Sequence, residues 1–548
     1  MNINRVFSLL LLAFMLMSCC AGCGGGTDSG TKAGMNRQIT DNNYDKSLAV
    51  KCINGTFVGR ISDDVMEFKG IPFVAKQPVG KLRWKAPVEF VPDNGVYEAY
   101  YNAKIPYQEE SASEPASMYA QGEDCLYLNI WTADNDMRNK PVMVWIHGGG
   151  FVSGGTVDPM FNLHNLVAEN PDIIAVSIAY RVGPFGFMHL SHLPDGADYP
   201  DAQNLGIMDQ VMALKWVHDN IANFGGDPDN VTIWGESAGA DSVILIPLIS
   251  GAENYVKRVI AQSGSPVISN TPEQSIECTA EIMKILNCKT VKDLQNVDVK
   301  ELINASETLK MRVGPERDGI YIPADPYGEY ANGAVRDIAI LQGCNKDEMN
   351  YFMSIVGGSE TFVEETNKRL AKYITQLTDT ERAKLNSFIS DDKFADAESY
   401  EPWRSLYNQI WFIAPLFRLS ENQAKSGGKS YTYYFTPESS IPDMKCCHAM
   451  ELSTVLNNPE NTIYTGRVLD ETFAKTMRKM WIQFARTGDP SLSAENSPDG
   501  KAHNWPLYNP DDKELMVFDE FNIHTAKEAE LKILDWDRMY FITKYYLF

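Results

Sequence analysis

A strand that turns sharply through a serine into a helix constrains this chain more than any other feature of its sequence. The stretch Val231–Gly239 reads V-T-I-W-G-E-S-A-G. Its first residues have the apolar character of a buried strand, and the residues from Ala238 onward have that of a helix. Gly235 and Gly239 flank Ser237, because side chains there would collide with the strand or the helix. The turn therefore predicts a strained, accessible serine at a helix N-terminus, and Ser237 is the candidate nucleophile.

A glycine loop upstream has the character of an oxyanion hole. Pro141–Ile146 is apolar without alternation, as expected for a strand covered on both faces, and it leads into H-G-G-G-F (His147–Phe151). Successive glycines leave backbone N–H groups uncovered, so a charged oxygen can approach closely. For either motif alone, G-E-S-A-G or H-G-G-G-F, the alternative interpretation is a glycine-rich turn with no catalytic role. Their joint occurrence favours catalysis, with His147 in a structural role.

The order of the predicted elements indicates a parallel α/β sheet. Asp172–Tyr180, Arg258–Gln262 and Ile338–Leu341 have the composition of core strands, and Gln203–Phe224 has apolar residues at helical spacing. Strands alternating with helices are typical of this class. Further helices are expected at Pro272–Asn287, Trp403–Lys425 and Glu471–Arg486, and hairpins at a sheet edge over Lys51–Ile71.

Composition fits one large domain and excludes some partners. The chain has 548 residues, of which 44% are hydrophobic, so it can bury a large core. Its 72 acidic residues against 49 basic ones give a net charge of −23. This charge argues against nucleic acid and anionic lipid headgroups as partners.

The N-terminus predicts export. Residues 1–23 contain Arg5 followed by an apolar run too short to span a bilayer, which is typical of a signal peptide. Leu16–Cys19 resembles the lipobox of bacterial lipoproteins, so Cys19 is the candidate lipidation site; an ordinary cleaved signal is the alternative. Residues 24–46 are expected to form a flexible tether and residues 47–548 the folded domain. We therefore expect a lipid anchor at a bacterial envelope membrane, periplasmic or at the cell surface.

A serine hydroxyl needs an imidazole to accept its proton and a carboxylate to orient that imidazole. Three histidines follow the serine with room for an acid between: His448, His503 and His524. Only His448 lies just past a predicted strand, Tyr431–Thr436, so it is the one expected to reach the carboxyl edge of the sheet.

Two carboxylates compete for the role of the acid. Asp347 and Glu348 both come a few residues past Ile338–Leu341. Because ligands bind at the carboxyl ends of parallel strands, both are expected near the serine. The residues alone leave the two open.

Several longer motifs occur together in a specific order. They are G-I-P-F, E-D-C-L-Y-L-N-I-W, H-G-G-G-F, Y-R-V-G-P-F-G-F, G-E-S-A-G, Q-S-G-S-P, G-C-N-K-D-E and H-A-M-E-L. From about Ala49 to the C-terminus the chain thus resembles the type-B carboxylesterases, a family with the α/β-hydrolase fold that includes cholinesterases and the non-catalytic neuroligins.

The resemblance implies roles for particular residues. Ser237 would be the nucleophile, Glu348 rather than Asp347 the acid, and His448 the base. The other implied site residues are Gly149, Gly150 and Ala238 in the oxyanion hole, Ser263 and Glu236 in support of the triad, and Phe151, Tyr351 and Phe352 in the substrate pocket. No metal or organic cofactor is implied.

The cysteines partly follow the family. Of ten cysteines, none forms a paired C-x-x-C pattern typical of a metal site. The resemblance implies a Cys278–Cys288 disulfide, for which the chain must turn back near Asn287, because ten residues of unbroken helix span ~15 Å. The family's usual partner of Cys125 is missing, so Cys125 is either free or paired unusually, for example with Cys52. The pairing of Cys344, Cys446 and Cys447 stays open.

Together these features predict a serine hydrolase of uncharged carboxylic esters that works through an acyl-enzyme. The segment before Cys125 lacks the tryptophan on which cholinesterases seat a quaternary ammonium, which disfavours choline esters. The alternatives are a lipase or sterol esterase, and a neuroligin-like binding module. The filled triad positions argue against the binding module. The oligomeric state is left open.

Overall fold

The computed structural model describes residues 36–109, 118–135, 137–309, 313–354, 371, 374–389, 401–531 and 533. The predicted signal peptide, Cys19 and the tether up to residue 35 lie outside the described residues. Within the described part of the chain, no helix has the length and apolarity needed to cross a membrane.

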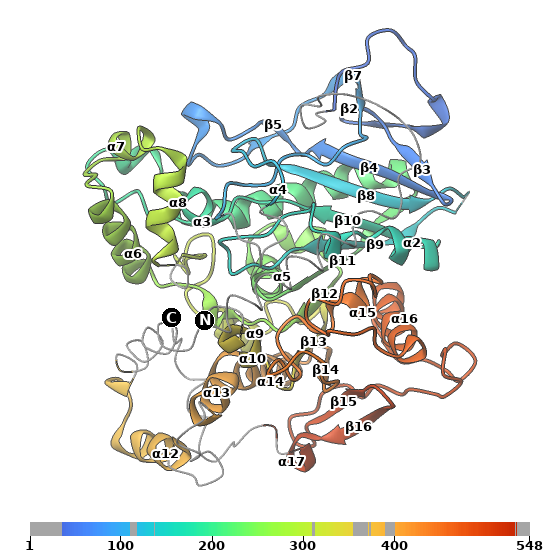
Figure 1. Cartoon of the computed structure of the whole chain (residues 1–548), viewed down its shortest axis with the longest axis vertical. Helices are drawn as coiled ribbons and strands as arrows, with labels where there is room; N and C mark the ends of the chain where they lie inside the picture. Colours follow the sequence, from blue (N-terminus) through green and yellow to red (C-terminus); the bar gives the residue numbers. More distant parts are fainter. Residues whose placement is uncertain are drawn as a thin grey trace, which may run out of the picture. The chain divides into compact units, whose positions relative to one another are not determined.

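One large sheet forms the centre of the domain. Its order is β16-β15-β14-β13-β12-β11-β9-β10-β8-β4-β3 among the described strands. The strands from β10 to β15 run parallel, and antiparallel strands follow at both edges. The bounds are β3 Arg60–Ser62, β4 Val65–Pro72, β8 Tyr127–Ala133, β9 Lys140–Ile146, β10 Ile174–Ile178, β11 Gly226–Glu236, β12 Arg258–Gln262, β13 Ala339–Asn345, β14 Ser430–Phe435, β15 Glu514–Asp519 and β16 Asn522–Lys527. The order, visible in Figure 1, confirms the predicted mostly parallel α/β sheet.

A smaller sheet near the N-terminus is mixed. β1 (Ala49–Cys52) and β2 (Asn54–Val58) form the expected antiparallel hairpin. β7 (Asp93–Glu98) pairs with β2 in parallel, so the small N-terminal sheet combines an antiparallel hairpin with one parallel pair. Two strands of the main sheet, β3 and β4, lie between β2 and β7 in the chain. This long connection lets β7 return in the same direction as β2. β5 (Val74–Lys76) and β6 (Val88–Glu89) pair separately.

Helices connect and cover the strands. Their bounds are α2 His164–Glu169, α3 Gly183–Gly186, α4 Leu205–Asn220, α5 Ala238–Leu245, α6 Pro272–Ile285, α7 Val291–Gln295, α8 Val299–Glu307, α9 Pro326–Asn332, α10 Met349–Ser354, α12 Asp379–Ile389, α13 Glu401–Asn408, α14 Ala414–Lys425, α15 Leu452–Val455, α16 Glu471–Thr487 and α17 Glu528–Leu531. The predicted helix over Trp403–Lys425 is interrupted by a π-helix at Gln409–Ile413. Pro415, two residues after the π-helix, has no N–H to donate to the Trp411 carbonyl, which favours a locally widened turn.

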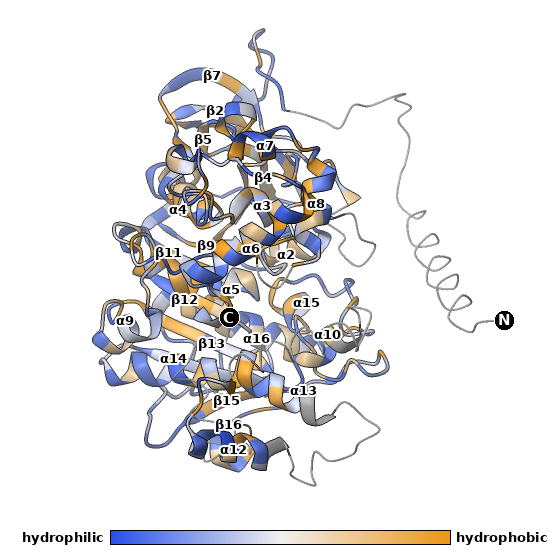
Figure 2. Cartoon of the chain, turned by 90° about the vertical axis from the view of Figure 1, so that its left-hand side faces the viewer, coloured by the Kyte–Doolittle hydropathy of each residue, from blue (hydrophilic) through white to orange (hydrophobic). Residues whose placement is uncertain are grey.

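The strands carry apolar side chains on both faces. In β9, Val142, Val144 and Ile146 pack in the same apolar cluster as residues of α4 and α5. Met143 and Trp145 point to the opposite face and join the cluster that contains residues of α16. This double burial explains why the strand is apolar without alternation. Figure 2 shows hydrophobic colouring along the central strands.

Candidate active site

The serine turn lies where β11 ends and α5 begins. Ser237 has φ 55° and ψ −127°, a strained conformation for a residue with a side chain. Two backbone hydrogen bonds hold it: the Ser237 N–H donates to the Gln262 carbonyl, and the Asp241 N–H donates to the Ser237 carbonyl, both at 2.9 Å. A Cβ on Gly239 would lie 2.1 Å from the Ile146 carbonyl oxygen. The close approach of β9 thus explains this glycine of G-x-S-x-G.

The glycine loop after β9 passes beside the serine. A Cβ on Gly148 would lie 3.1 Å from the Ser237 Cβ. Gly149 has φ 104° and Gly150 φ 60°, values that let the loop turn back toward the sheet. Ala238, the third predicted oxyanion residue, begins α5 directly after Ser237, so it and the position Gly148 of the loop both adjoin the serine.

His147 opens this loop and has a structural environment. Its ring stacks on Tyr180 with centroids 4.4 Å apart, and the Tyr180 hydroxyl donates to the His147 carbonyl at 2.9 Å. Burial lowers the pKa of His147 to about 4, so the imidazole is neutral at physiological pH.

Glu348 and His448 meet at the carboxyl edge of the sheet. Glu348 follows β13, and His448 comes after β14 and its loop. The Glu348 Oε2 lies 2.6 Å from the His448 Nδ1, and both side chains are buried. Since a carboxylate only accepts, Nδ1 carries the proton and Nε2 is left to accept another.

Two further donors fix the carboxylate of Glu348. Its Oε1 accepts from the Ser263 hydroxyl at 2.5 Å and from the Asn345 N–H at 2.6 Å. Ser263 directly follows β12 and has φ 56°. The supporting serine therefore contacts the acid rather than the nucleophile.

Asp347 has a different partner. Its N–H donates to the Cys446 carbonyl at 2.9 Å, and its carboxylate accepts from the Cys446 N–H at 3.4 Å. Of the two acids that the sequence left open, Glu348 is the one in contact with His448.

Glu236 faces the other nitrogen of the imidazole. Its Oε1 lies 3.0 Å from the His448 Nε2, an ion-pair contact without hydrogen-bond geometry. Burial opposes the charged form of His448, but the carboxylates of Glu236 and Glu348 outweigh it and raise the pKa of His448 well above its ordinary value. Burial likewise raises the pKa of Glu236.

Glu451 is a third buried carboxylate that the sequence analysis missed. It accepts from the Gln262 side chain at 2.9 Å and from the Asn345 side chain at 2.6 Å. Burial, together with the charges of Glu236 and Glu348, raises the pKa of Glu451 to about 7. The signal was an acid three residues past His448 in an otherwise apolar helical pattern, H-A-M-E-L.

Aromatic rings surround the imidazole. Phe352 and Phe412 each lie 5.2 Å from the His448 ring, and Tyr351 lies 6.0 Å from it, as centroid distances. Phe412, on the π-helix, falls within Trp403–Lys425, for which the sequence predicts only a helix, so it is not among the predicted pocket residues. Phe151, the third predicted pocket residue, is fully buried, and its ring centroid lies 5.3 Å from that of Phe187.

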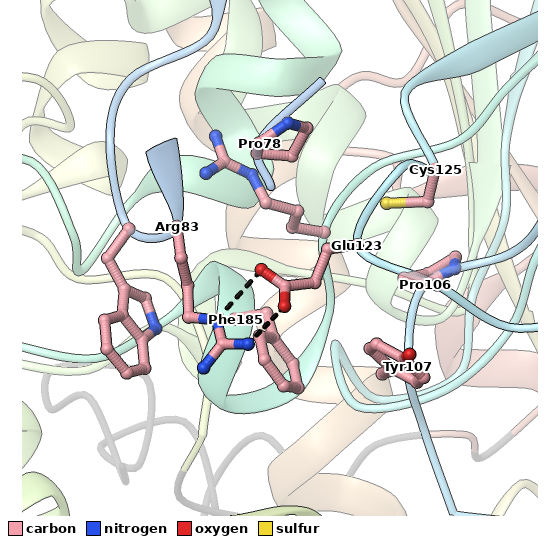
Figure 3. A pocket seen from close by; sticks show the side chains of 10 residues that line it. Pro78, Arg83, Pro106, Tyr107, Glu123, Cys125 and Phe185 are labelled. Atoms are coloured by element: carbon pink, nitrogen blue, oxygen red, sulfur yellow. Dashed lines mark hydrogen bonds and ion pairs between the residues drawn. The ribbon is translucent and has the colours of Figure 1, made fainter. Parts of the chain in front are cut away.

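A separate hollow lies beside Cys125 (Figure 3). It encloses about 250 Å³ of space partly open to solvent. Arg83 in its wall pairs with Glu123, and Arg181 pairs with the buried Asp209 at 2.7 Å. Both cations are thus neutralised. Cys125 and Cys52 are free thiols, which decides between the alternatives left open for Cys125.

The predicted Cys278–Cys288 disulfide is not formed in this structure. Asn287, with φ 52°, does turn the chain back as expected. However, the Cys288 N–H then bonds to the Met283 carbonyl at 2.9 Å. Met283 lies five residues beyond Cys278 in α6, roughly 7–8 Å along the helix, which is too far for a bridge.

The described residues include no group of three or more His, Cys, Asp or Glu side chains that could hold a metal ion.

Comparison with known proteins identifies the family. The model of the carboxylesterase family matches residues 46–533. Para-nitrobenzyl esterase of Bacillus subtilis (strain 168) is 32% identical over 501 residues, covering 87% of this chain and 96% of that protein. Acetylcholinesterase of Bungarus fasciatus is 30% identical over 499 residues, covering 83% of this chain and 79% of that protein. A solved carboxylesterase of Geobacillus stearothermophilus has a TM-score of 0.75 at 31% identity, covering 89% of this chain and 99% of that chain. The chain therefore belongs to the carboxylesterase family and is a carboxylic ester hydrolase with the α/β-hydrolase fold.

Proposed function

We propose that this enzyme cleaves uncharged carboxylic esters through an acyl-enzyme on Ser237. The proposal rests on the 2.6 Å contact between Glu348 and His448, because an imidazole oriented in this way is what a serine nucleophile needs. The strained turn of Ser237 at the same edge of the sheet supports it.

In the first step, His448 Nε2 takes the proton of the Ser237 hydroxyl, and the Ser237 Oγ attacks the ester carbonyl carbon. The tetrahedral intermediate then collapses, the bond to the alcohol oxygen breaks, and the imidazolium returns the proton to that oxygen. Water repeats the sequence on the acyl-enzyme and releases the acid. Glu348 keeps the imidazole oriented and stabilises its charged form.

Glu236 holds the imidazole between turnovers. In the described structure Nε2 makes no hydrogen bond, although it lies 3.0 Å from the Glu236 carboxylate. Binding of substrate brings Nε2 from this carboxylate to the neighbouring Ser237 hydroxyl, since catalytic hydrogen bonds often tighten only in the complex.

The N–H groups of Gly149, Gly150 and Ala238 stabilise the oxyanion. The close approach of the Gly148 position to Ser237 supports this assignment, because it brings the glycine loop beside the attacked carbonyl.

The alcohol and acyl groups of the substrate lie against the apolar side chains around His448. Tyr351, Phe352 and Phe412 around His448 favour neutral esters. We expect kcat/KM to be higher for acetyl and butyryl esters of neutral alcohols than for the choline esters. A kinetic panel in which choline esters or long-chain triglycerides are the best substrates would favour a cholinesterase-like or lipase activity instead.

The nucleophile and the acid are tested by substitution. Ser237→Ala should lower kcat for p-nitrophenyl butyrate by several orders of magnitude, and Glu348→Gln by up to about 10⁴-fold. Asp347→Asn is the matched control and should keep most of the activity. Retention of a tenth of kcat by Ser237→Ala would contradict the assignment. Comparable losses in Glu348→Gln and Asp347→Asn would leave no special role for Glu348.

We further propose that the enzyme is exported and anchored by lipid on Cys19. The apolar run after Arg5, the lipobox-like Leu16–Cys19 and the tether that follows support this location.

A further inference from the structure

A second hydroxyl, imidazole and carboxylate contact one another in sequence. The Ser191 Oγ lies 3.1 Å from the His189 Nε2, and the His189 Nδ1 lies 2.7 Å from the Glu316 Oε2. The order of groups is that of an activated nucleophile, its base and the acid that orients the base. This trio shares no residue with the Ser237 site.

Several other elements fix the acid and the base of the trio. The side chain of Asn204, just before α4, donates to the Glu316 carbonyl at 2.9 Å and accepts from the Glu316 N–H at 2.8 Å. The His189 N–H donates to the Thr279 hydroxyl on α6 at 3.1 Å. These bonds fix the main chain of Glu316 and of His189, from which the two side chains meet.

Burial and hydrogen bonding set the proton positions. The Glu316 side chain is 1% exposed and the His189 side chain 14%. The Glu316 carboxylate can only accept, so the proton of neutral His189 is on Nδ1 and its Nε2 accepts from the Ser191 hydroxyl. Ser191 itself is exposed, so an external reagent can reach its Oγ.

We propose that Ser191 is a second nucleophile, which accepts an acyl group from activated esters with a good leaving group. The Ser191 Oγ forms a bond to the acyl carbon, and its proton goes to the His189 Nε2. The bond from the acyl carbon to the leaving oxygen then breaks, and that oxygen departs as the phenolate or takes the proton from His189. The product is an acyl ester of Ser191.

The test uses the full chain with Ser237→Ala, so that the main nucleophile cannot react. We would treat this variant with p-nitrophenyl acetate and locate acetyl groups by peptide mass spectrometry. Ser191 should be acetylated about a hundredfold faster than the exposed Ser250, since a positioned base contributes about 10²–10⁴-fold.

Two further variants in the same background separate activation from mere exposure. His189→Gln should slow acetylation of Ser191 by about a hundredfold, because the base is removed. His192→Gln is the matched control: its ring centroid lies 5.5 Å from that of His189, but the substitution leaves the Ser191–His189 contact intact. Acetylation should then continue at the parent rate.

Folding is monitored independently. His189→Gln in the chain with Ser237 intact should keep its turnover of p-nitrophenyl acetate. Equal acetylation of Ser191 and Ser250, or an unchanged rate at Ser191 in His189→Gln, would overturn the proposal. Loss of the label in both histidine variants would also overturn it, since His192 has no part in the trio.

Discussion

The Glu348 Oε2 and the His448 Nδ1 lie 2.6 Å apart, and both side chains are buried. Glu236 faces the same imidazole from its other nitrogen at 3.0 Å. His448 is therefore enclosed between two carboxylates, which raise its pKa well above the ordinary value although burial opposes the charge. Since only the neutral imidazole can act as a base, activity should rise with pH through this raised pKa.

The first prediction concerns Glu236. Glu236→Gln removes a negative charge next to His448, so the pKa of His448 should fall. The neutral base is then available at lower pH, and the acid limb of the kcat/KM profile should move to lower pH. The profile is measured with a neutral p-nitrophenyl ester.

Asp347→Asn is the control for this experiment, because Asp347 contacts Cys446 rather than the imidazole. Its acid limb should stay where it is in the wild type. A limb that moves to higher pH in Glu236→Gln would contradict the electrostatic role of Glu236.

Ser263 should affect turnover rather than binding. Ser263→Ala removes one of the donors that fix the Glu348 carboxylate. Hydrogen bonds to charged groups contribute about 1.5–3 kcal/mol, so kcat should fall by about 10- to 100-fold if the whole contribution is lost in the transition state. KM should change little, because Ser263 contacts the acid. A raised KM with unchanged kcat would instead indicate a contact with substrate.

The space beside Ser237 can be tested at Gly148. A Cβ there would lie 2.8 Å from the Glu236 carbonyl oxygen and 3.1 Å from the Ser237 Cβ, so Gly148→Ala should displace the nucleophile and lower kcat by at least about tenfold. Gly314→Ala is the control, because its nearest contacts, at 3.5 and 3.6 Å, are ordinary. Equal activities of the two variants would show that the loop adapts freely.

The anchor is tested by fractionation of cells. Cys19→Ala should move the enzyme from the membrane to the soluble fraction and remove labelled palmitate, because the lipid would be attached to this thiol. Palmitate incorporated as strongly as in the wild type would point to Cys20 or Cys23.

Local patterns in the sequence were sufficient to predict the sheet and the turn that carries Ser237. β12 has the predicted bounds, Arg258–Gln262, because strands buried on both faces are continuous apolar runs. The helix after Pro272 begins as expected, since Thr271 and Gln274 form a capping box. For such elements, the local sequence and the tertiary structure agree.

Contacts between distant residues could not be derived in this way. Spacing alone did not separate Asp347 from Glu348, because the choice depends on which carboxylate faces a histidine 100 residues later. Glu451 was missed for a similar reason: its donors, Gln262, Asn345 and Tyr433, lie on the three strands β12, β13 and β14. The implied Cys278–Cys288 bridge depended on the exact return of the chain after Asn287.

The last prediction concerns the stability contributed by Glu451. Its pKa in the folded protein is about 7, raised from 4.5 by burial and then by the charges of Glu236 and Glu348. A group whose pKa is raised on folding stabilises the protein below its unfolded pKa, and this stability is lost as the pH rises through the folded pKa. The loss from pH 5 to pH 8 amounts to at most about 3 kcal/mol.

Glutamine cannot lose a proton, so Glu451→Gln should lose less stability than the wild type over this range. Urea unfolding midpoints at pH 5 and pH 8 measure the difference. Glu460→Gln, at an exposed glutamate in the following loop, is the control, and its stability should fall between pH 5 and pH 8 as much as that of the wild type. If the unfolding midpoints of Glu451→Gln and the wild type differ by the same amount at pH 5 and at pH 8, Glu451 does not titrate between these pH values.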